Sequence, residues 1–176
     1  EYAVCKVKSD TRFLIVCKDA VKVLKDDIVN IEEVVKGSDL LGLEYETCFD
    51  ELPLQNFSHK IVAWDQVDSS TGTGAVHIAP GCGTEDKDFE LGKVLGLETV
   101  MPVDEYGNYY SNFGFLSGLP CDSVNDIIFE ELSKRGKMYY THDITHSYPV
   151  CWRCKKPLIW RLSREWYIKV DEVRPQ

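Results

Sequence analysis

The stretch that organises this chain reads GTGAVHIAPGCGTED and runs from Gly72 to Asp86. Its first half has strand character, and its second half is a glycine-rich turn followed by acids, which favour the first turn of a helix. Glycines in a turn allow a ligand or another chain segment to approach the backbone closely. The stretch therefore predicts a strand over residues 74–79, then a close-packed turn, then a helix.

His77 and Asp86 make this stretch a candidate site. His77 projects from the predicted strand and can exchange a proton near neutral pH, and Asp86 lies near the free N–H groups of the first helical turn. A purely structural interpretation competes, in which His77 is a hydrogen-bonded core histidine and Asp86 only complements the helix dipole. Spacing alone favours the structural interpretation, so the residue pattern establishes a candidate and no more.

The sequence on either side predicts an α+β domain dominated by antiparallel strands, arranged like a barrel flanked by two helices. Strand-like runs occur at residues 2–7, 13–17, 60–67, 74–79 and 137–140, with a further strand pair around residues 104–107. Residues 60–67 and 74–79 are expected to form a hairpin, because residues 68–73 have turn composition.

Helices are expected at three places from their start and stop signals. The first is short and covers residues 20–25. The second, between Thr84 and Gly96, has an inward apolar stripe that includes Val94. The third, between Ser123 and Gly136, begins with a capping-box pattern.

Composition limits the class of protein. A chain of 176 residues with 44% apolar residues can bury the core of one globular domain. It has no leader pattern and no apolar run near the roughly 20 residues that span a bilayer, which predicts a soluble, cytoplasmic chain without a membrane partner. Because the sequence starts at Glu1, within a strand-like run, we expect the chain to be an excised piece of a longer protein.

The charge is unevenly distributed. A net charge of -9 argues against a protein that binds nucleic acid through bulk positive charge, so any contact with RNA has to be local. From His146 onward, however, basic residues outnumber acids. In the same region Trp152, Leu158, Trp160 and Leu162 alternate as a half-buried strand would, which predicts packing rather than stacking on bases.

The stretch from Gly72 to Asp86 resembles the GTGxVHxAPxxGxED signature of the editing domain of isoleucyl-tRNA synthetases. Valyl and leucyl relatives typically lack histidine at the position of His77, so the subfamily is assigned from that residue. A second block, HSYPVCWRCKKPLI at residues 146–159, resembles the segment where these enzymes return from the editing insertion to the catalytic core. The resemblance implies a barrel-like editing domain over residues 1–145 and a return segment over residues 146–176.

The resemblance also implies a reaction, hydrolysis of the ester in tRNA(Ile) mischarged with valine. Asp86 is expected to hold the α-ammonium group and His77 to line the side-chain and ribose end of the pocket, both counted as catalytic, with no general base assigned. The implied substrate contacts are Gly74, His77, Ala79, Pro80, Glu85 and Asp86. Editing needs no cofactor, whereas ATP belongs to a catalytic domain outside this sequence. The implied partners are tRNA(Ile) carrying valine and the rest of the synthetase in cis.

Cys151 and Cys154 have the Cys-x-x-Cys spacing of a metal site, but one pair supplies only half of a four-ligand zinc site. Two reduced structural thiols beside Trp152 are the alternative. In many synthetases of the resembled family, this pair joins another Cys-x-x-Cys before the insertion, so zinc is expected only with ligands from elsewhere. A small zinc-binding module remains the least favoured function.

The resembled family has one further element, a Thr-rich strand with the pattern TTxPWT, which is expected upstream of Glu1. That strand forms the opposite wall of the pocket. Two alternatives therefore accompany the editing hypothesis: a catalytically incomplete structural or tRNA-binding fragment, and the editing domain of a valyl or leucyl relative.

Overall fold

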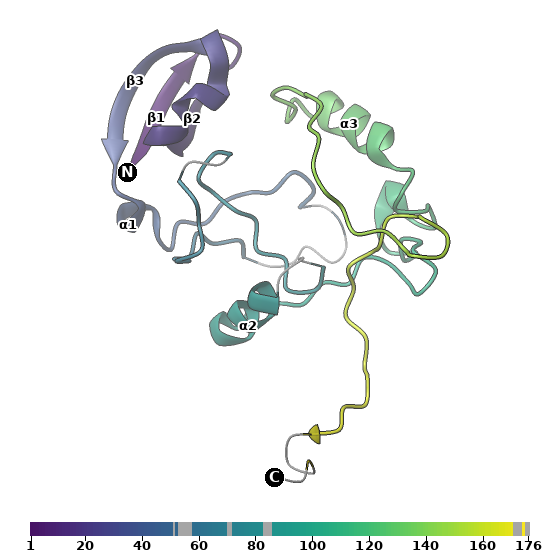
Figure 1. Cartoon of the computed structure of the whole chain (residues 1–176). Coiled ribbons are helices and arrows are strands. Elements are labelled where there is room, and N and C mark those ends of the chain that lie inside the picture. Colours follow the sequence, from purple (N-terminus) through teal and green to yellow (C-terminus); the bar gives the residue numbers. More distant parts are fainter. Residues whose placement is uncertain (51, 53–57, 70–71, 83–85, 171–173, 175–176) are drawn as a thin grey trace. The chain divides into compact units, whose positions relative to one another are not determined.

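The computed structural model describes residues 1–50, 52, 58–69, 72–82, 86–170 and 174 (Figure 1). The chain divides into two compact units, one that runs up to Ile78 and one that runs from Ala79 and includes Leu52. The boundary between them falls inside residues 72–86, which we call the signature stretch. The assignment of residues 1–145 and 146–176 as two functional regions stays a prediction.

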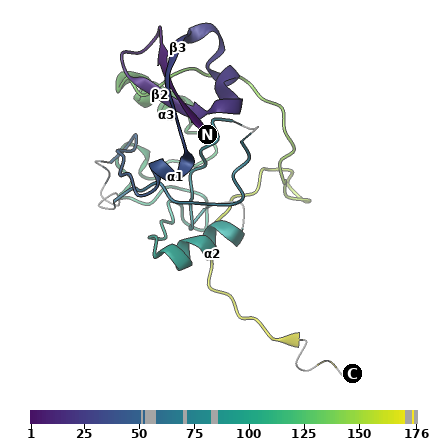
Figure 2. The ribbon, with the colours of Figure 1, turned by 90° about the vertical axis from the view of Figure 1, so that its left-hand side faces the viewer.

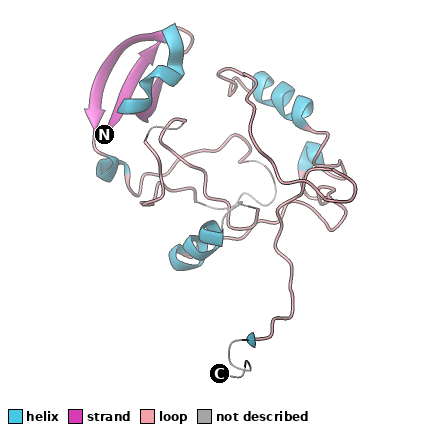
Figure 3. Ribbon diagram, viewed as in Figure 1, coloured by secondary structure: helices cyan, strands magenta, loops and turns pink. Residues whose placement is uncertain are grey.

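The first unit is built on three antiparallel strands, β1 (Tyr2–Val7), β2 (Phe13–Cys17) and β3 (Ile28–Val35). Their order is β2-β1-β3, so β1 is the central strand and is paired on both sides. Figure 3 draws all three strands, in magenta, within this N-terminal part of the chain. The predicted strands at residues 2–7 and 13–17 are confirmed.

Strand β3 was not expected from the sequence, because its run IVNIEEVV does not alternate between apolar and polar residues. The pairing explains the irregularity. Cys5 lies opposite Ile31 and Val4 lies opposite Glu33, so the register shifts by one residue at Glu32. A bulge of this kind breaks the period-2 alternation by which a strand is identified in the sequence.

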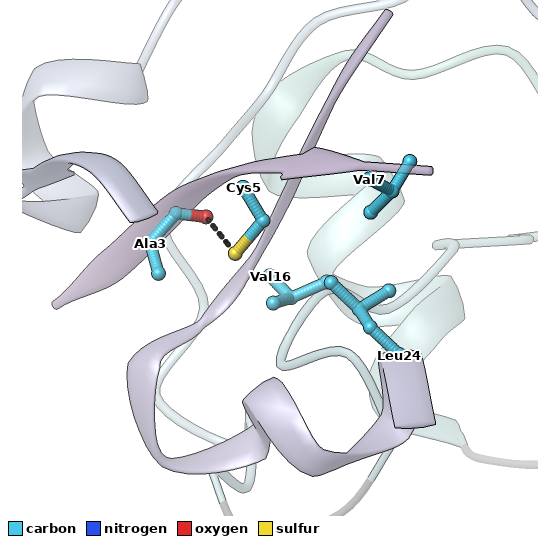
Figure 4. Packing of buried hydrophobic residues seen from close by; sticks show 5 residues of the cluster. All are labelled: Ala3, Cys5, Val7, Val16 and Leu24. Atoms are coloured by element: carbon cyan, nitrogen blue, oxygen red, sulfur yellow. Dashed lines mark hydrogen bonds between the residues drawn. The ribbon is translucent and has the colours of Figure 1, made fainter. Parts of the chain in front are cut away.

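The core of the first unit lies between the sheet and η1 (Lys18–Asp27), a 3₁₀ helix that occupies the place of the short helix predicted at residues 20–25. Figure 4 shows its five most buried members, Ala3, Cys5, Val7, Val16 and Leu24. The Cys5 thiol donates to the carbonyl oxygen of Ala3 over 3.8 Å, which satisfies the sulfur within this apolar cluster. The alternating residues of β1 and β2 thus bury one face, as their pattern predicts.

The predicted hairpin of residues 60–67 and 74–79 is wrong for the described residues. The first segment pairs elsewhere: the Ile61 N–H donates to Leu43 over 3.0 Å, and the Tyr45 N–H donates to His59 over 3.0 Å. Residues 75–79 form neither strand nor helix. Backbone groups bond to whichever segment reaches them, and here residues 42–45 reach the first segment. A short helix α1 (Gly37–Leu40) precedes them, where a polar connection was expected.

The second unit contains α2 (Asp86–Leu95), η2 (Gly114–Leu116) and α3 (Asn125–Lys134), with the two longer helices labelled in Figure 2. Its core consists of Phe113, Leu116 and Val124. The predicted stop of α2 is confirmed, since Gly96 has a φ of 65° after the last helical residue. The predicted inward stripe is wrong, because Val94 is 82% exposed and α2 instead buries Asp88 and Gly92.

The start of α3 differs from the predicted capping box. Val124 occupies the N-cap position, and the Ser123 hydroxyl donates to the Pro120 carbonyl oxygen over 3.1 Å instead of capping the helix. The predicted end is confirmed, with Gly136 at a φ of 62°. Residues 137–140 are not a strand, and the strand pair expected around residues 104–107 is a tight turn closed by one bridge between Val103 and Tyr109.

The α+β class with antiparallel strands is confirmed, but the three-stranded sheet is open at β2 and at β3, so a barrel is not formed by the described residues. Among the helices that the structure describes, none is both long enough and apolar enough to cross a membrane.

Candidate functional site

The signature stretch begins where the backbone is held against the sheet of the first unit. The Tyr2 hydroxyl donates to the Gly74 carbonyl oxygen over 2.6 Å, and the Cys17 N–H donates to the Thr73 carbonyl oxygen over 2.7 Å. Gly74 has a φ of 74°, and a Cβ on it would lie 2.3 Å from the Cys17 Cβ. Only glycine fits there, so the close approach expected from the sequence occurs, and its partner is Cys17 of the same chain.

His77 lies three residues beyond this contact and is exposed. It makes no hydrogen bond or ion pair within the described part of the chain, as its neighbours Ala75 and Val76 are also exposed. The structural alternative of a hydrogen-bonded core histidine is therefore wrong. An exposed imidazole is available to a bound molecule.

The rest of the stretch belongs to the second unit and forms a tight turn at Ala79–Cys82, closed by a bond of 3.1 Å from the Cys82 N–H to the Ala79 carbonyl oxygen. A Cβ on Gly81 would lie 2.0 Å from the Val100 carbonyl oxygen, and one on Gly92 would lie 2.6 Å from the Pro80 ring. Two glycines therefore let this turn pack against α2 and against Val100. Ala79 and Pro80 are thereby held in place by the backbone.

The structure describes only part of the pair Glu85 and Asp86, the two acids assigned to the substrate. Asp86 is the first residue of α2, in agreement with its predicted place in the first helical turn, but its side chain lies outside the described residues. Glu85 and Thr84 also lie outside them. The roles assigned to Asp86 and Glu85 stay predictions.

A residue that the sequence reasoning missed is Asp88, in the first turn of α2. Its side chain is buried, with 8% exposure, and its Oδ1 has no hydrogen-bond partner among the residues that the structure describes. Burial, and then the negative charge of Asp88, raise the pKa of the Cys82 thiol. The only signal in the sequence is a third acid after Glu85 and Asp86, which does not reveal which of the acids points inward.

Cys151 and Cys154 lie in a short loop whose ends are joined by a bridge between Val150 and Pro157. The Cys151 N–H donates to Lys156 over 2.8 Å, the Lys155 N–H donates to Cys151 over 2.9 Å, and Lys155 has a φ of 61°. Hydrogen bonds from the backbone N–H groups of Cys154 and Arg153, and then from the Cys154 side chain, lower the pKa of the Cys151 thiol.

This loop fits one half of a thiolate metal site, because backbone N–H groups that face a sulfur stabilise the thiolate that binds metal. Within the described residues no group of three or more histidine, cysteine or acidic side chains is placed to hold a metal ion. Both thiols are free, and further ligands would have to come from elsewhere.

The segment that follows the loop does not form the expected half-buried strand. Trp152 is 80% exposed, Trp160 is 42% exposed and Trp166 is fully exposed. Residues 160–169 carry no strand or helix and continue as an extended segment, drawn in yellow in Figure 1. Within the described chain these aromatic side chains lack the packing that their pattern predicts.

Comparison with known proteins gives a consistent set of relatives, although no protein-family model matches the chain. An isoleucine–tRNA ligase of Methanothermobacter thermautotrophicus is 36% identical over 99% of the chain, and one of Archaeoglobus fulgidus is 40% identical over 100% of it. An isoleucine–tRNA ligase of Thermotoga petrophila is 42% identical over 82% of the chain. The aligned part is 16%, 18% and 15% of these relatives, respectively, so the chain spans about a sixth of their length.

Proposed function

Since the chain belongs to the isoleucine–tRNA ligase family, as a segment of about a sixth of its relatives' length, we propose that it is the editing part of such an enzyme. The proposed reaction is hydrolysis of the ester that joins valine to tRNA(Ile). The need for it is physical: one methylene distinguishes valine from isoleucine, and it supplies only roughly 1–3 kcal/mol of discrimination at a synthetic site.

The observation that carries the proposal is the signature stretch, taken together with its local structure. Gly74 is held against Cys17, His77 is exposed on the irregular segment that follows, and α2 begins at Asp86. The glycines therefore have a packing role, whereas His77 has no structural role among the described residues. His77 lacks structural partners among the described residues although its stretch is closely packed, which supports a role for His77 in binding.

In the proposed mechanism a water oxygen attacks the ester carbonyl carbon. The bond from that carbon to the ribose oxygen breaks, the ribose oxygen takes up a proton, and free valine leaves. Asp86 holds the α-ammonium group of valine, since a carboxylate is the natural partner of a cation in a shielded pocket. This contact orients the carbonyl for attack, and no general base is assigned.

The remaining assigned residues define the second sieve of the proposed site. His77 lines the pocket at the valine side chain and the ribose, and the size of the pocket excludes isoleucine. Gly74, Ala79, Pro80 and Glu85 complete the proposed contacts. A barrel-like form of the domain is part of the proposal and needs strands beside β2 or β3 that the described sheet does not contain.

The same family membership supports proposals about the whole protein. It is proposed to be an ATP-dependent isoleucine–tRNA ligase of protein biosynthesis, acting in the cytoplasm on tRNA(Ile). Its ATP chemistry belongs to segments outside this chain. Zinc bound through Cys151 and Cys154 is proposed for the whole protein, with the remaining ligands supplied by another segment.

A second candidate function is docking without hydrolysis. The exposed Trp152, Trp160 and Trp166 lie among basic residues, a combination that binds single-stranded RNA by stacking and charge. In this alternative the chain holds tRNA or the catalytic core and cleaves nothing. The alternative of a valyl or leucyl parent is not proposed, because the relatives named above are isoleucine–tRNA ligases.

The decisive experiment compares hydrolysis of valyl-tRNA(Ile) and isoleucyl-tRNA(Ile) by the intact protein, by this chain, and by a version extended upstream. We expect the intact protein to cleave the valyl ester selectively and Asp86→Ala to abolish that cleavage. Binding of tRNA without cleavage by the intact protein would support docking and overturn the editing proposal.

A further inference from the structure

We propose that Tyr2 is a positioning residue for His77, an inference that rests on the editing function proposed above. Two adjacent carbonyl groups, those of Thr73 and Gly74, are held by the sheet of the first unit. We call Tyr2, Cys17, Thr73 and Gly74 the backbone anchor. It is the last place before His77 at which the described chain is bonded to a strand.

Tyr2 suits this role because its own position is well determined. It lies in the central strand β1, opposite Cys17 on one side and Val35 on the other. A Cβ on Gly37 would come within 3.1 Å of the Tyr2 ring, so the ring packs closely on that glycine. The hydroxyl is therefore presented from a rigid base, and it meets the Gly74 carbonyl oxygen at 2.6 Å.

The contacts that Cys17 makes within the anchor limit the directions in which Gly74 can move. The Cys17 N–H holds Thr73 over 2.7 Å, and the Cys17 Cβ fills the space where a side chain on residue 74 would lie. Gly74 can move away from Cys17 but not toward it. The hydroxyl of Tyr2 is the contact that opposes this movement, since it bonds the carbonyl oxygen of Gly74 itself.

On its N-terminal side His77 depends on the anchor, because among the described residues nothing between Gly74 and His77 is bonded to a strand. Residues 75–77 are exposed, and within the described part of the chain their only hydrogen bond is one of 3.4 Å from the Thr73 hydroxyl to the Ala75 carbonyl oxygen. Because His77 lies only three residues beyond Gly74, a rotation of the Gly74 backbone also displaces the imidazole. Displacements of about 1 Å are enough to slow a reaction strongly.

The test is Tyr2→Phe in the intact protein, with Tyr106→Phe as the matched control. Tyr2→Phe keeps the ring on Gly37 and removes only the hydroxyl, whereas Tyr106 is 79% exposed. We expect kcat for hydrolysis of valyl-tRNA(Ile) to fall about fivefold to tenfold in Tyr2→Phe, the effect of one hydrogen bond, with a smaller change in KM. Tyr106→Phe is expected to change neither.

A double-mutant comparison separates positioning from general destabilisation. If Tyr2 acts through His77, Tyr2→Phe has no further effect on kcat once His77→Ala is present. An undiminished fivefold loss in the His77→Ala background would overturn the proposal, because Tyr2 would then act on something else.

A readout independent of catalysis distinguishes failure of this inference from failure of the proposed function. The ring signals of His77 in an NMR spectrum of the histidine-labelled intact protein are expected to move in Tyr2→Phe and to stay in place in Tyr106→Phe. Unchanged His77 signals in both variants would overturn the proposal that Tyr2 positions His77. If the unaltered protein does not hydrolyse valyl-tRNA(Ile), the editing proposal fails, whereas moved signals still support the contact between Tyr2 and the His77 segment.

Discussion

The sheet of the first unit and the segment after residue 146 have similar apolar patterns but different outcomes. In the sheet, Ala3 and Cys5 alternate with half-buried or exposed residues and are almost completely buried. In the C-terminal segment, Leu158 and Trp160 are likewise two residues apart, yet both are more than 40% exposed, as is Ile159 between them. A pattern buries its apolar face only where a partner covers it, and η1 covers the sheet whereas the described chain offers the segment no such cover.

Thiol alkylation is expected to show this contrast most strongly. Burial raises the pKa of the Cys5 thiol, whereas backbone N–H groups of Cys154 and Arg153 lower that of Cys151, which therefore forms thiolate more readily. We expect Cys151 and Cys154 to react with iodoacetamide on the order of a thousandfold faster than Cys5, measured by mass spectrometry of peptides. Comparable rates would mean that the sheet opens as easily as the segment. In the intact protein, where another segment is proposed to supply the remaining ligands, added zinc should protect Cys151 and Cys154.

Gly74→Ala is expected to give the largest change in stability. The new Cβ would lie 2.3 Å from Cys17 at a φ of 74°, so steric clash adds to backbone strain. We expect a loss of about 4 kcal/mol in the free energy of unfolding, measured with urea.

Gly118→Ala is the matched control, because Gly118 has a φ of 75° and no atom within 4 Å of its absent Cβ. It is expected to lose only about 1 kcal/mol, the cost of the backbone conformation alone. Equal losses at the two positions would contradict the contact with Cys17.

Leu24→Ala and Leu158→Ala compare the two regions with the same chemical change. Leu24 is 4% exposed in the sheet core, so its truncation leaves a cavity and should cost about 3 kcal/mol of unfolding free energy. Leu158 is 45% exposed, and its truncation should change that free energy by no more than about 0.5 kcal/mol. A large loss for Leu158→Ala in chemical denaturation would show that the segment is covered after all.

The smallest effect is expected at the ion pair in the turn between β1 and β2. Arg12 donates to both carboxylate oxygens of Asp10 and, mainly through these hydrogen bonds, lowers the pKa of Asp10 from 3.8 to about 2. Because the folded pKa is below the unfolded one, the stabilisation is present above pH 3.8 and is lost as the pH falls through about 2.

Asp10→Asn should therefore lower stability near neutral pH slightly and remove an equally small part of its acid dependence, since the Arg12 side chain is exposed to solvent and screened by it. Thermal melts of the two proteins at several pH values below 4 measure the difference. Identical acid dependence would mean that the pair does not persist in solution.

Part of the fold was predictable from local sequence patterns. The strands at residues 2–7 and 13–17 and the ends of the helices at Gly96 and Gly136 agree with the structure, because alternation and helix-stop glycines act within a few residues. Strand β3 was missed because its bulge at Glu32 breaks the period that identifies a strand. The hairpin was wrong because strand character does not say which segment will be the partner.

The candidate site divides in the same way. The sequence identified His77 and Asp86 by chemistry and resemblance, and it predicted a close backbone approach at the glycines. It did not reveal that Cys17 is the partner of Gly74, or that Asp88 is buried in the first turn of α2. Those facts depend on contacts between residues far apart in the chain.

The sequence by itself determined the family, the residues able to do chemistry and the short elements whose signals are local. Only the tertiary structure decided which segments pair, that Tyr2 and Cys17 hold the backbone before His77, and that His77 itself is exposed. The physical reason is that propensity and capping act over a few neighbouring residues, whereas burial and hydrogen bonding depend on what folding brings alongside.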